Sequence, residues 1–274
     1  MRIHILTKLQ NEPWGGGNQF LRALRDELRS KGEYGETAKE ADVVLYNSYQ
    51  DLPHAIALRR QFPHKKFIHR LGPILSLHRG KWWQQVDRLG VALAETIADG
   101  IIFQSQWSAA MANRFGFTNT IPSSIIHHAA PSDIFFPATN PTAGEKIRLM
   151  AVSWSKNINK GFSFYSWLDT HLDFVRYSMT FVGHAPVSFQ HITSVGVKKS
   201  REIAELSRAH DIFISAVADD ACSNTIVEAL ASGLPVVARD SGANKELVGD
   251  GGVFWSNERE LLEAIHAVSQ NVSL

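Results

Sequence analysis

Short apolar runs alternate with longer stretches of helical periodicity along this chain, and this alternation limits the folds available to it. In the first half the apolar runs occupy residues 2–7, 42–46, 66–69, 100–103 and 124–127, and helical stretches occupy 52–61, 81–98 and 107–114. A run that is apolar throughout is typical of a strand buried on both faces, and intervening helices connect such strands in parallel. The pattern predicts an α/β chain built on parallel sheets.

The same pattern repeats in the second half. Predicted strands lie at 148–152, 179–183, 211–217 and 234–238, and predicted helices at 161–172, 201–209, 224–231 and 258–268. Between the halves, residues 139–144 (TNPTAG) are polar and rich in turn formers, which is typical of a linker. We therefore predict two domains of the nucleotide-binding, Rossmann-like type, at residues 1–140 and 141–274. A length of 274 residues with 44% hydrophobic residues is sufficient for two such cores.

Composition narrows the classes of partner. Lys and Arg number 28 against 27 Asp and Glu, so charge gives no reason to expect nucleic acid as a partner. The single cysteine, Cys222, cannot form an internal disulfide, which favours a reducing compartment. The N-terminus is too polar for a signal peptide and no apolar run reaches the ~20 residues of a membrane span, so we expect a cytoplasmic protein.

Polar residues gather where the strand predicted at 211–217 ends and the next helix begins. Asp220 lies in the loop, Ser223, Asn224 and Thr225 begin the helix with Ser223 as a candidate N-cap, and Glu228 follows within the helix. The N–H groups of a helix N-terminus suit a phosphate, and carboxylates suit the hydroxyl groups of a sugar. Open α/β sheets bind ligands at this edge. Together these residues predict a site for a sugar nucleotide.

The spacing of these residues is similar to a known motif. The matching positions are Asp220, Glu228–Ala229, Ala231, Gly233 and Pro235–Val237, followed by Gly242 and Glu246–Val248. They resemble the retaining GT-B glycosyltransferases (glycosyl transferases group 1, family 4), which have an acidic residue, seven residues, and then a glutamate that opens EA-x-A-x-G-x-PVV. That family usually has Glu where this chain has Asp220, and a Gly-rich turn at 221–223. The resemblance implies two Rossmann-like domains facing each other across a cleft, with the donor bound by the second and the acceptor by the first.

A second segment resembles the same family. SWSKNINKG, residues 153–161, follows a predicted strand and opens a helix, in the place of the family's G-R-x-x-x-x-K-G. Lys160 matches the family's lysine, and Lys156 is our substitute for an arginine that this chain lacks. The resemblance implies that these cations hold the diphosphate and stabilise its charge as it leaves, in place of a metal ion. The Asp219–Asp220 pair also lacks D-x-D spacing, so we expect neither a metal nor a cofactor.

Two features of the first half, the glycines at 15–17 and His69, also resemble this family. Glycines 15–17 follow a strand and open a helix, but a dinucleotide fingerprint would need glycine where Phe20 stands. The resemblance instead places Gly16 and Gly17 near the donor phosphate, whereas a tight turn alone is the simpler interpretation. His69, at the end of a strand, resembles a histidine that lies by the donor sugar and is predicted as catalytic, although a structural histidine is the alternative.

The resemblance implies retaining transfer from a UDP-, GDP- or ADP-linked sugar to a glycan, lipid-linked or small-molecule acceptor, as in polysaccharide biosynthesis. Lys160, Asp220 and His69 would carry the chemistry. The alternatives are a sugar-nucleotide epimerase or hydrolase of the same fold, and a non-catalytic nucleotide-sugar-binding protein.

Residues 1–140 hold 16 Lys and Arg against 12 Asp and Glu. With Trp82 and Trp83 in a basic segment, this excess makes the first domain a candidate for peripheral membrane contact at the inner membrane face. Sugar stacking and internal packing are alternatives for the two tryptophans.

Overall fold

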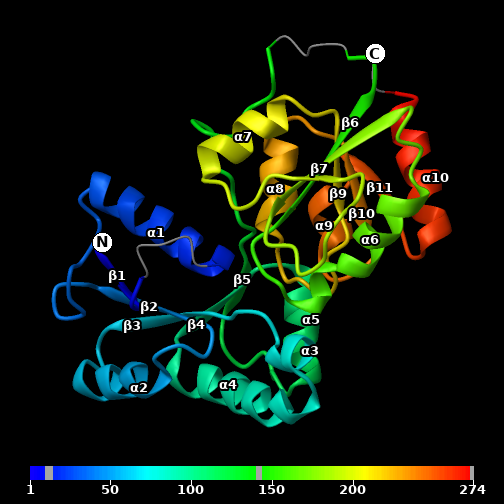
Figure 1. Cartoon of the computed structure of the whole chain (residues 1–274). Helices are drawn as coiled ribbons and strands as arrows, with labels where there is room; N and C mark the ends of the chain where they lie inside the picture. Colours follow the sequence, from blue (N-terminus) through cyan, green and yellow to red (C-terminus); the bar gives the residue numbers. More distant parts are fainter. Residues whose placement is uncertain (10–14, 140–143, 272–274) are drawn as a thin grey trace. The chain divides into compact units, whose positions relative to one another are not determined.

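The computed structural model describes residues 1–9, 15–139 and 144–271 (Figure 1). It divides into two compact units, Met1–His127 and His128–Leu274. Each unit has its own parallel sheet and its own hydrophobic clusters.

The first unit has a five-stranded parallel sheet in the order β1-β2-β3-β4-β5. Its strands are β1 (Ile3–Leu6), β2 (Val43–Asn47), β3 (Lys66–Arg70), β4 (Gly100–Phe103) and β5 (Ser123–Ile125). Its helices are α1 (Gly15–Ser30), α2 (Leu52–Gln61), α3 (Leu75–Arg79), the 3-10 helix η1 (Lys81–Trp83), α4 (Gln84–Ile97) and α5 (Gln106–Arg114).

Helices cover both faces of this sheet (Figure 1). Leu21 and Leu28 of α1 pack with Ile5 and Leu45 on one face, while apolar residues of α2 and α4 pack with β2 and β3 on the other. After α1 the chain forms a parallel bridge between Tyr34 and Ile3, on the side of β1 away from β2, before it enters β2. The direction of strand addition therefore reverses between β1 and β2, which is the kind of position where doubly wound sheets bind ligands.

The second unit has a six-stranded parallel sheet in the order β11-β10-β9-β6-β7-β8. Its strands are β6 (Ile147–Ser153), β7 (Tyr177–Gly183), β8 (Thr193–Ser194), β9 (Ile212–Ser215), β10 (Val236–Arg239) and β11 (Gly252–Trp255). Its helices are the 3-10 helix η2 (Ile158–Lys160), α6 (Phe162–His171), α7 (Ser200–Arg208), α8 (Asn224–Ala231), α9 (Asn244–Val248) and α10 (Glu258–Ser269). The order is that of the doubly wound nucleotide-binding sheet, with its reversal between the neighbouring strands β6 and β9.

Two hydrophobic clusters fill the two faces of the second sheet. One packs α6 and α10 against one face, through residues such as Tyr165, Leu168 and Ile265. The other packs α7 and α8 against the opposite face, through Ile203, Ile226 and Ala229. Because both faces are covered, the inner strands are mostly apolar, as in β9 (IFIS), which makes them recognisable as apolar runs.

The division between the units falls earlier than the boundary predicted at residue 140. Phe135 is buried in the second unit's cluster with α7 and α8, and Arg208 donates a hydrogen bond from Nη1 to the carbonyl oxygen of Ile134 (3.1 Å). The segment before residue 140 is therefore bound to the second unit by burial that its local composition does not reveal. Most of the linker predicted at 139–144 lies outside the described residues.

The prediction of an α/β chain on parallel sheets is confirmed, and the predicted strands and helices have observed counterparts with small differences at their ends. The described elements that the sequence did not predict are short: α3, η2, β8, α9 and β11. Elements of two to five residues contain too few repeats of either pattern for periodicity to identify them. None of the helices in the described part of the chain combines the length and apolar character needed to cross a membrane.

Candidate functional site

The loop that follows β6 is fixed against the end of β9. In η2, the Asn157 side chain accepts a hydrogen bond from the Asn159 N–H (2.9 Å), and the Asn159 carbonyl accepts one from the Ala218 N–H (2.8 Å). Gly161 has φ of 75°, and a Cβ added there would lie 2.3 Å from the carbonyl oxygen of Ala216. Only glycine allows both this left-handed conformation and this close approach. The loop therefore holds Lys160 at a defined place beside the loop that follows β9.

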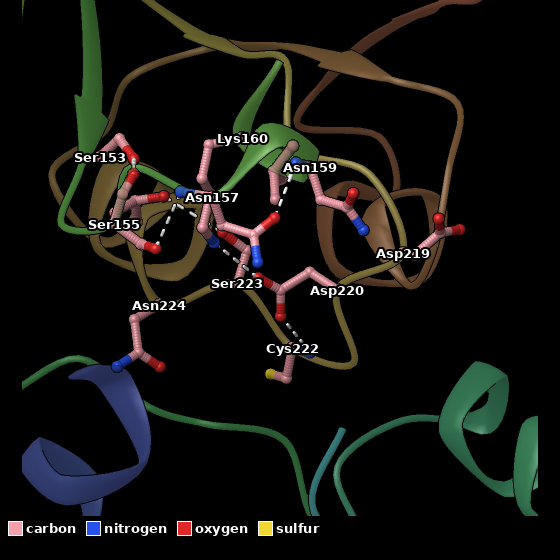
Figure 2. A network of polar contacts seen from close by, with 12 residues as sticks. Ser153, Ser155, Asn157, Asn159, Lys160, Asp219, Asp220, Cys222, Ser223 and Asn224 are labelled. Atoms are coloured by element: carbon pink, nitrogen blue, oxygen red, sulfur yellow. Dashed lines mark hydrogen bonds and ion pairs between the residues drawn. The ribbon is translucent and has the colours of Figure 1, made fainter. Parts of the chain in front are cut away.

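Lys160 and Asp220 meet at the carboxyl edge of the sheet (Figure 2). Lys160 Nζ lies 3.2 Å from Asp220 Oδ2, while Asp220 Oδ1 accepts a hydrogen bond from the Cys222 N–H at 3.2 Å. The two ion-paired side chains are only 29% and 24% exposed. The Asp220 backbone is also fixed, because its carbonyl accepts the Ala243 N–H at 3.0 Å and Gly242, with φ of 59°, approaches it closely. The structure thus places a cation and a carboxylate, sixty residues apart in sequence, in one partly exposed pair.

The N-terminus of α8 lies beside this pair. Ser223 occupies the N-cap position with extended backbone angles, but it makes no side-chain cap hydrogen bond. Its hydroxyl is instead 3.1 Å from that of Thr225. The prediction of Ser223 as an N-cap is therefore right in position and wrong in its side-chain contact. Asn224 Oδ1 contacts His128 Nδ1, and the Cys222 thiol accepts the His128 N–H at 3.3 Å, so His128 braces this turn.

Glu228 lies one turn further along α8 and is half-buried. Burial raises the pKa of Glu228 to about 7, well above the usual range of a glutamate. The carboxyl group is therefore poised to be protonated or ionised near neutral pH. A group in this state can donate a hydrogen bond or accept several from hydroxyl groups.

Asn244 is a buried residue that the sequence did not single out. Its Nδ2 donates to the Val217 carbonyl at 3.0 Å and to the Arg239 carbonyl at 2.9 Å. It therefore connects the loops that follow β9 and β10 beneath the Asp220 turn. A polar residue that bridges two strand ends produces no local periodicity, so no sequence signal could have identified it.

Lys156 is the remaining predicted site residue of the second unit. Lys156 is exposed, whereas Lys160 is ion-paired. The geometry therefore distinguishes the two lysines that the sequence placed in one motif. It assigns to Lys160 the position beside Asp220 and α8.

In the first unit, His69 is fully buried rather than open to a ligand. Its Nε2 donates to the Ser48 carbonyl (2.7 Å), and its ring stacks on Tyr46 with centroids 4.3 Å apart. Burial lowers the pKa of His69 to about 4, so the ring is neutral at neutral pH. These contacts fit the structural alternative: the imidazole fixes the Ser48 turn, where φ is 52°. A catalytic role for His69 stays a prediction.

Gly16 and Gly17 lie in the first turn of α1, at the carboxyl edge of the first sheet. No described atom lies within 4 Å of a Cβ added at Gly17, and its φ is not positive. The described part of the chain therefore gives no steric reason for glycine there, unlike at Gly161. Next to this edge, the buried Arg70 donates to Asn47 Oδ1 (2.7 Å) with its guanidinium 4.4 Å from the Phe20 ring centroid, a cluster that sequence analysis did not identify.

The described side chains contain no group of three or more His, Cys, Asp or Glu residues placed to hold a metal ion. The polar groups of the site described above are one lysine, carboxylates, amides, hydroxyls and helix N–H groups. Such a set can bind an anion together with a polyhydroxylated group.

The fold places the chain in a defined structural class. Two parallel sheets with helices on both faces, the second in doubly wound order, match solved structures of GT-B glycosyltransferases, and the predicted GT-B fold is confirmed. Sucrose-phosphate synthase from Thermosynechococcus elongatus matches with a TM-score of 0.78 at 14% identity, over 99% of this chain and 90% of that one. HepE from Anabaena in complex with UDP-glucose matches with a TM-score of 0.73 at 18% identity, over 98% of this chain and 89% of that one.

Sequence comparison gives more local matches within this class. The family profile described as "Glycosyl transferases group 1" matches residues 174–271, which include β9, α8 and the turn of Asp220. Alpha-monoglucosyldiacylglycerol synthase from Acholeplasma laidlawii is 30% identical over 84 residues. That alignment covers 30% of this chain, and the chain spans 21% of the length of that relative.

Proposed function

We propose that this protein is a glycosyltransferase that uses a nucleotide sugar as donor. The observation that carries this proposal is the Lys160–Asp220 pair at the reversal point of a doubly wound sheet, beside the N-terminus of α8. A cation and helix N–H groups suit a diphosphate, and the two carboxyl groups suit the hydroxyl groups of ribose and sugar. The family profile and the solved complexes with UDP and UDP-glucose support the same conclusion.

We assign to the residues the roles that the resemblance implies. Lys160 and the N-terminus of α8, with Ser223, Asn224 and Thr225, bind the diphosphate of the donor. Glu228 binds the ribose, and Asp220 binds the transferred sugar. The exposed Lys156 makes a weaker contact with the diphosphate, and for Gly16 and Gly17 we keep the role in donor binding that the resemblance implies. The acceptor is a glycan, a lipid-linked sugar carrier or a small hydroxylated molecule.

Catalysis in this scheme is leaving-group stabilisation. As the bond between sugar and phosphate breaks, negative charge grows on the phosphate oxygen, so a cation aimed at that oxygen stabilises the transition state more than the bound donor. Before the donor arrives, Lys160 is held by Asp220. When the diphosphate binds, Lys160 exchanges its ion pair with Asp220 for one with the phosphate. Asp220 is then available to accept hydrogen bonds from the sugar. Because Lys160 and the helix N–H groups neutralise the charge, the transfer proceeds without a metal ion. The acceptor hydroxyl bonds to the anomeric carbon as the diphosphate leaves, and its proton passes to the departing phosphate oxygen. Attack from the face that the diphosphate leaves retains the anomeric configuration.

Binding of UDP-, GDP- and ADP-linked sugars, measured by calorimetry in the presence of EDTA, tests this proposal. We expect one base to be preferred and the affinity to fall in the Glu228→Gln and Lys160→Ala variants. Lys198→Ala is the matched control, because Lys198 is also a partly exposed, ion-paired lysine: it precedes α7 and its Nζ lies 3.4 Å from Glu202 Oε1. If no nucleotide sugar binds, or if binding requires Mg²⁺ or Mn²⁺, the proposed site is wrong.

Product analysis distinguishes the transferase from its alternatives. A transferase forms a new glycoside only when an acceptor is present, and NMR reports whether the anomeric configuration is retained. An epimerase or hydrolase converts the donor without an acceptor, and a non-catalytic binding protein leaves it unchanged.

A further inference from the structure

The solvent-facing side of η1 and α4 carries an apolar stripe. Trp82 is 95% exposed and Leu89 is 58% exposed, and Val86 lies between them in sequence and is also exposed. Their spacing of four and three residues places them along one side of the helical segment, while Val91 and Ala94 occupy the side packed on the first sheet. A tryptophan with almost its whole surface in water is costly unless something covers it.

Positive charge surrounds this stripe. Lys81, Arg88 and Arg79 are exposed beside it. Residues 75–92 contain one carboxylate, Asp87, which is buried and accepts hydrogen bonds from the N–H groups of Leu75 (2.8 Å) and Ser76 (2.9 Å). Asp87 therefore fixes α3 against α4 and presents no negative charge to the outside. The exposed charge of this surface is positive only.

Aromatic residues continue the surface toward α3. The Arg79 guanidinium lies 4.8 Å from the ring centroid of Trp83 and donates to the Tyr49 hydroxyl at 3.1 Å. Aromatic rings with a polar tip, next to basic side chains, are the residues that favour the boundary between lipid headgroups and acyl chains. The segment follows β3, so it lies toward the carboxyl edge of the first sheet.

We propose that the first unit docks on an anionic lipid bilayer through this surface, made up of Arg79, Lys81, Trp82, Val86, Arg88 and Leu89. Trp82 and Leu89 enter the boundary region, and the three basic side chains bind anionic headgroups. Both contributions are needed because one tryptophan and two aliphatic residues give only marginal membrane affinity by themselves. A second copy of the chain is a poorer occupant: three apolar side chains cover far less than the ~800 Å² per partner of a stable interface, and the basic rim would face itself.

Docking on a bilayer also bears on the kind of acceptor, and this consequence rests on the proposed transferase function. Docking through η1 holds the carboxyl edge of the first sheet near the bilayer. In the proposed function, this edge belongs to the unit that binds the acceptor. Docking therefore favours a lipid-linked acceptor over one free in solution. Vesicle binding itself needs no donor and no turnover, so it can be tested even if the transferase assignment fails.

Co-sedimentation of the full chain with phosphatidylcholine vesicles, with and without phosphatidylglycerol, tests the docking. We expect binding to the anionic vesicles that weakens as salt is raised. The Trp82→Ser and Leu89→Ser double variant should bind at least tenfold more weakly, and Lys81→Gln with Arg88→Gln should lose roughly fivefold per charge. Both variants replace exposed residues, and thermal unfolding verifies that they fold.

Matched controls are Val175→Ser, an exposed apolar residue of the second unit, and Arg114→Gln, an exposed basic residue of α5. Neither should change vesicle binding. If the wild-type chain does not bind anionic vesicles, or if the patch variants bind as well as the controls, the proposal is overturned. A dimer in sedimentation equilibrium that dissociates in the Trp82→Ser and Leu89→Ser variant, without vesicle binding, would show that a second copy covers the surface instead.

Discussion

At the scale of single residues, the two lysines of the loop after β6 differ in position and therefore in expected effect. Lys160 is ion-paired beside α8, whereas Lys156 is exposed. If Lys160 stabilises the charge that develops on the leaving phosphate, Lys160→Ala should lower kcat by roughly a hundredfold with a smaller change in KM. Lys156→Ala should do much less. Steady-state kinetics of both variants measure this, and a near-normal kcat for Lys160→Ala would remove the lysine from the mechanism.

The raised pKa of Glu228 gives a prediction about stability. Burial disfavours the ionised carboxylate in the folded chain, so the free energy of unfolding should decrease as pH rises from about 4.5 through about 7. Glu228→Gln removes this dependence. The variant should therefore gain stability relative to wild type between about pH 5 and about pH 8, by on the order of 1–3 kcal/mol.

Urea unfolding at the two pH values measures this difference. Glu258→Gln, at an exposed residue in the first turn of α10, is the control. If Glu228→Gln and wild type show the same change in unfolding free energy between the two pH values, Glu228 is not desolvated in the folded chain.

At the scale of elements, the η2 loop depends on Gly161. Gly161→Ala adds a Cβ at φ of 75° and 2.3 Å from a backbone oxygen of the neighbouring loop. Gly196→Ala adds a Cβ at a similar φ of 70°, with no described atom within 4 Å. Gly161→Ala has both the unfavourable backbone conformation and a displaced loop, so we expect its free energy of unfolding to fall by roughly 2–4 kcal/mol. For Gly196→Ala, which has only the unfavourable conformation, we expect a fall of about 1 kcal/mol.

Thermal unfolding compares the two glycine variants, and nucleotide binding gives an independent measurement. Displacement of η2 moves Lys160, so Gly161→Ala should also weaken donor binding while Gly196→Ala leaves it intact. Equal stability and equal binding in both variants would contradict the role of the close contact between the loops after β6 and β9.

At the scale of the whole molecule, the chain has two units with separate cores, and the proposed donor contacts lie mainly in the second. A nucleoside diphosphate at about a hundred times its dissociation constant should stabilise the state that binds it by about 2.7 kcal/mol. Hydrogen exchange with and without the nucleotide should show new protection at residues 153–161 and 218–225. Protection confined to the first unit would place the donor elsewhere.

Much of the fold could be predicted from the sequence because it depends on local patterns. Buried parallel strands are apolar along their whole length, and helices repeat with their own period, so both were recognisable before pairing was known. Helix α8 and strand β4 have the predicted bounds, and the spacing from Asp220 to Glu228 was readable because both belong to one loop-and-helix unit. The class of the fold and the segment in which to seek a site could therefore be predicted from these local patterns alone.

Which residues of the candidate site meet depends on how the strands and loops pack in three dimensions. The contact of Lys160 with Asp220 depends on the adjacency of β6 and β9, which is a property of strand order and not of either segment. The burial of His69, the bridging amide of Asn244 and the exposure of Trp82 were equally hidden, because each depends on which neighbours the fold brings to that residue. A local pattern specifies an element, whereas burial and electrostatic partners are specified by contacts between residues that are distant in the sequence.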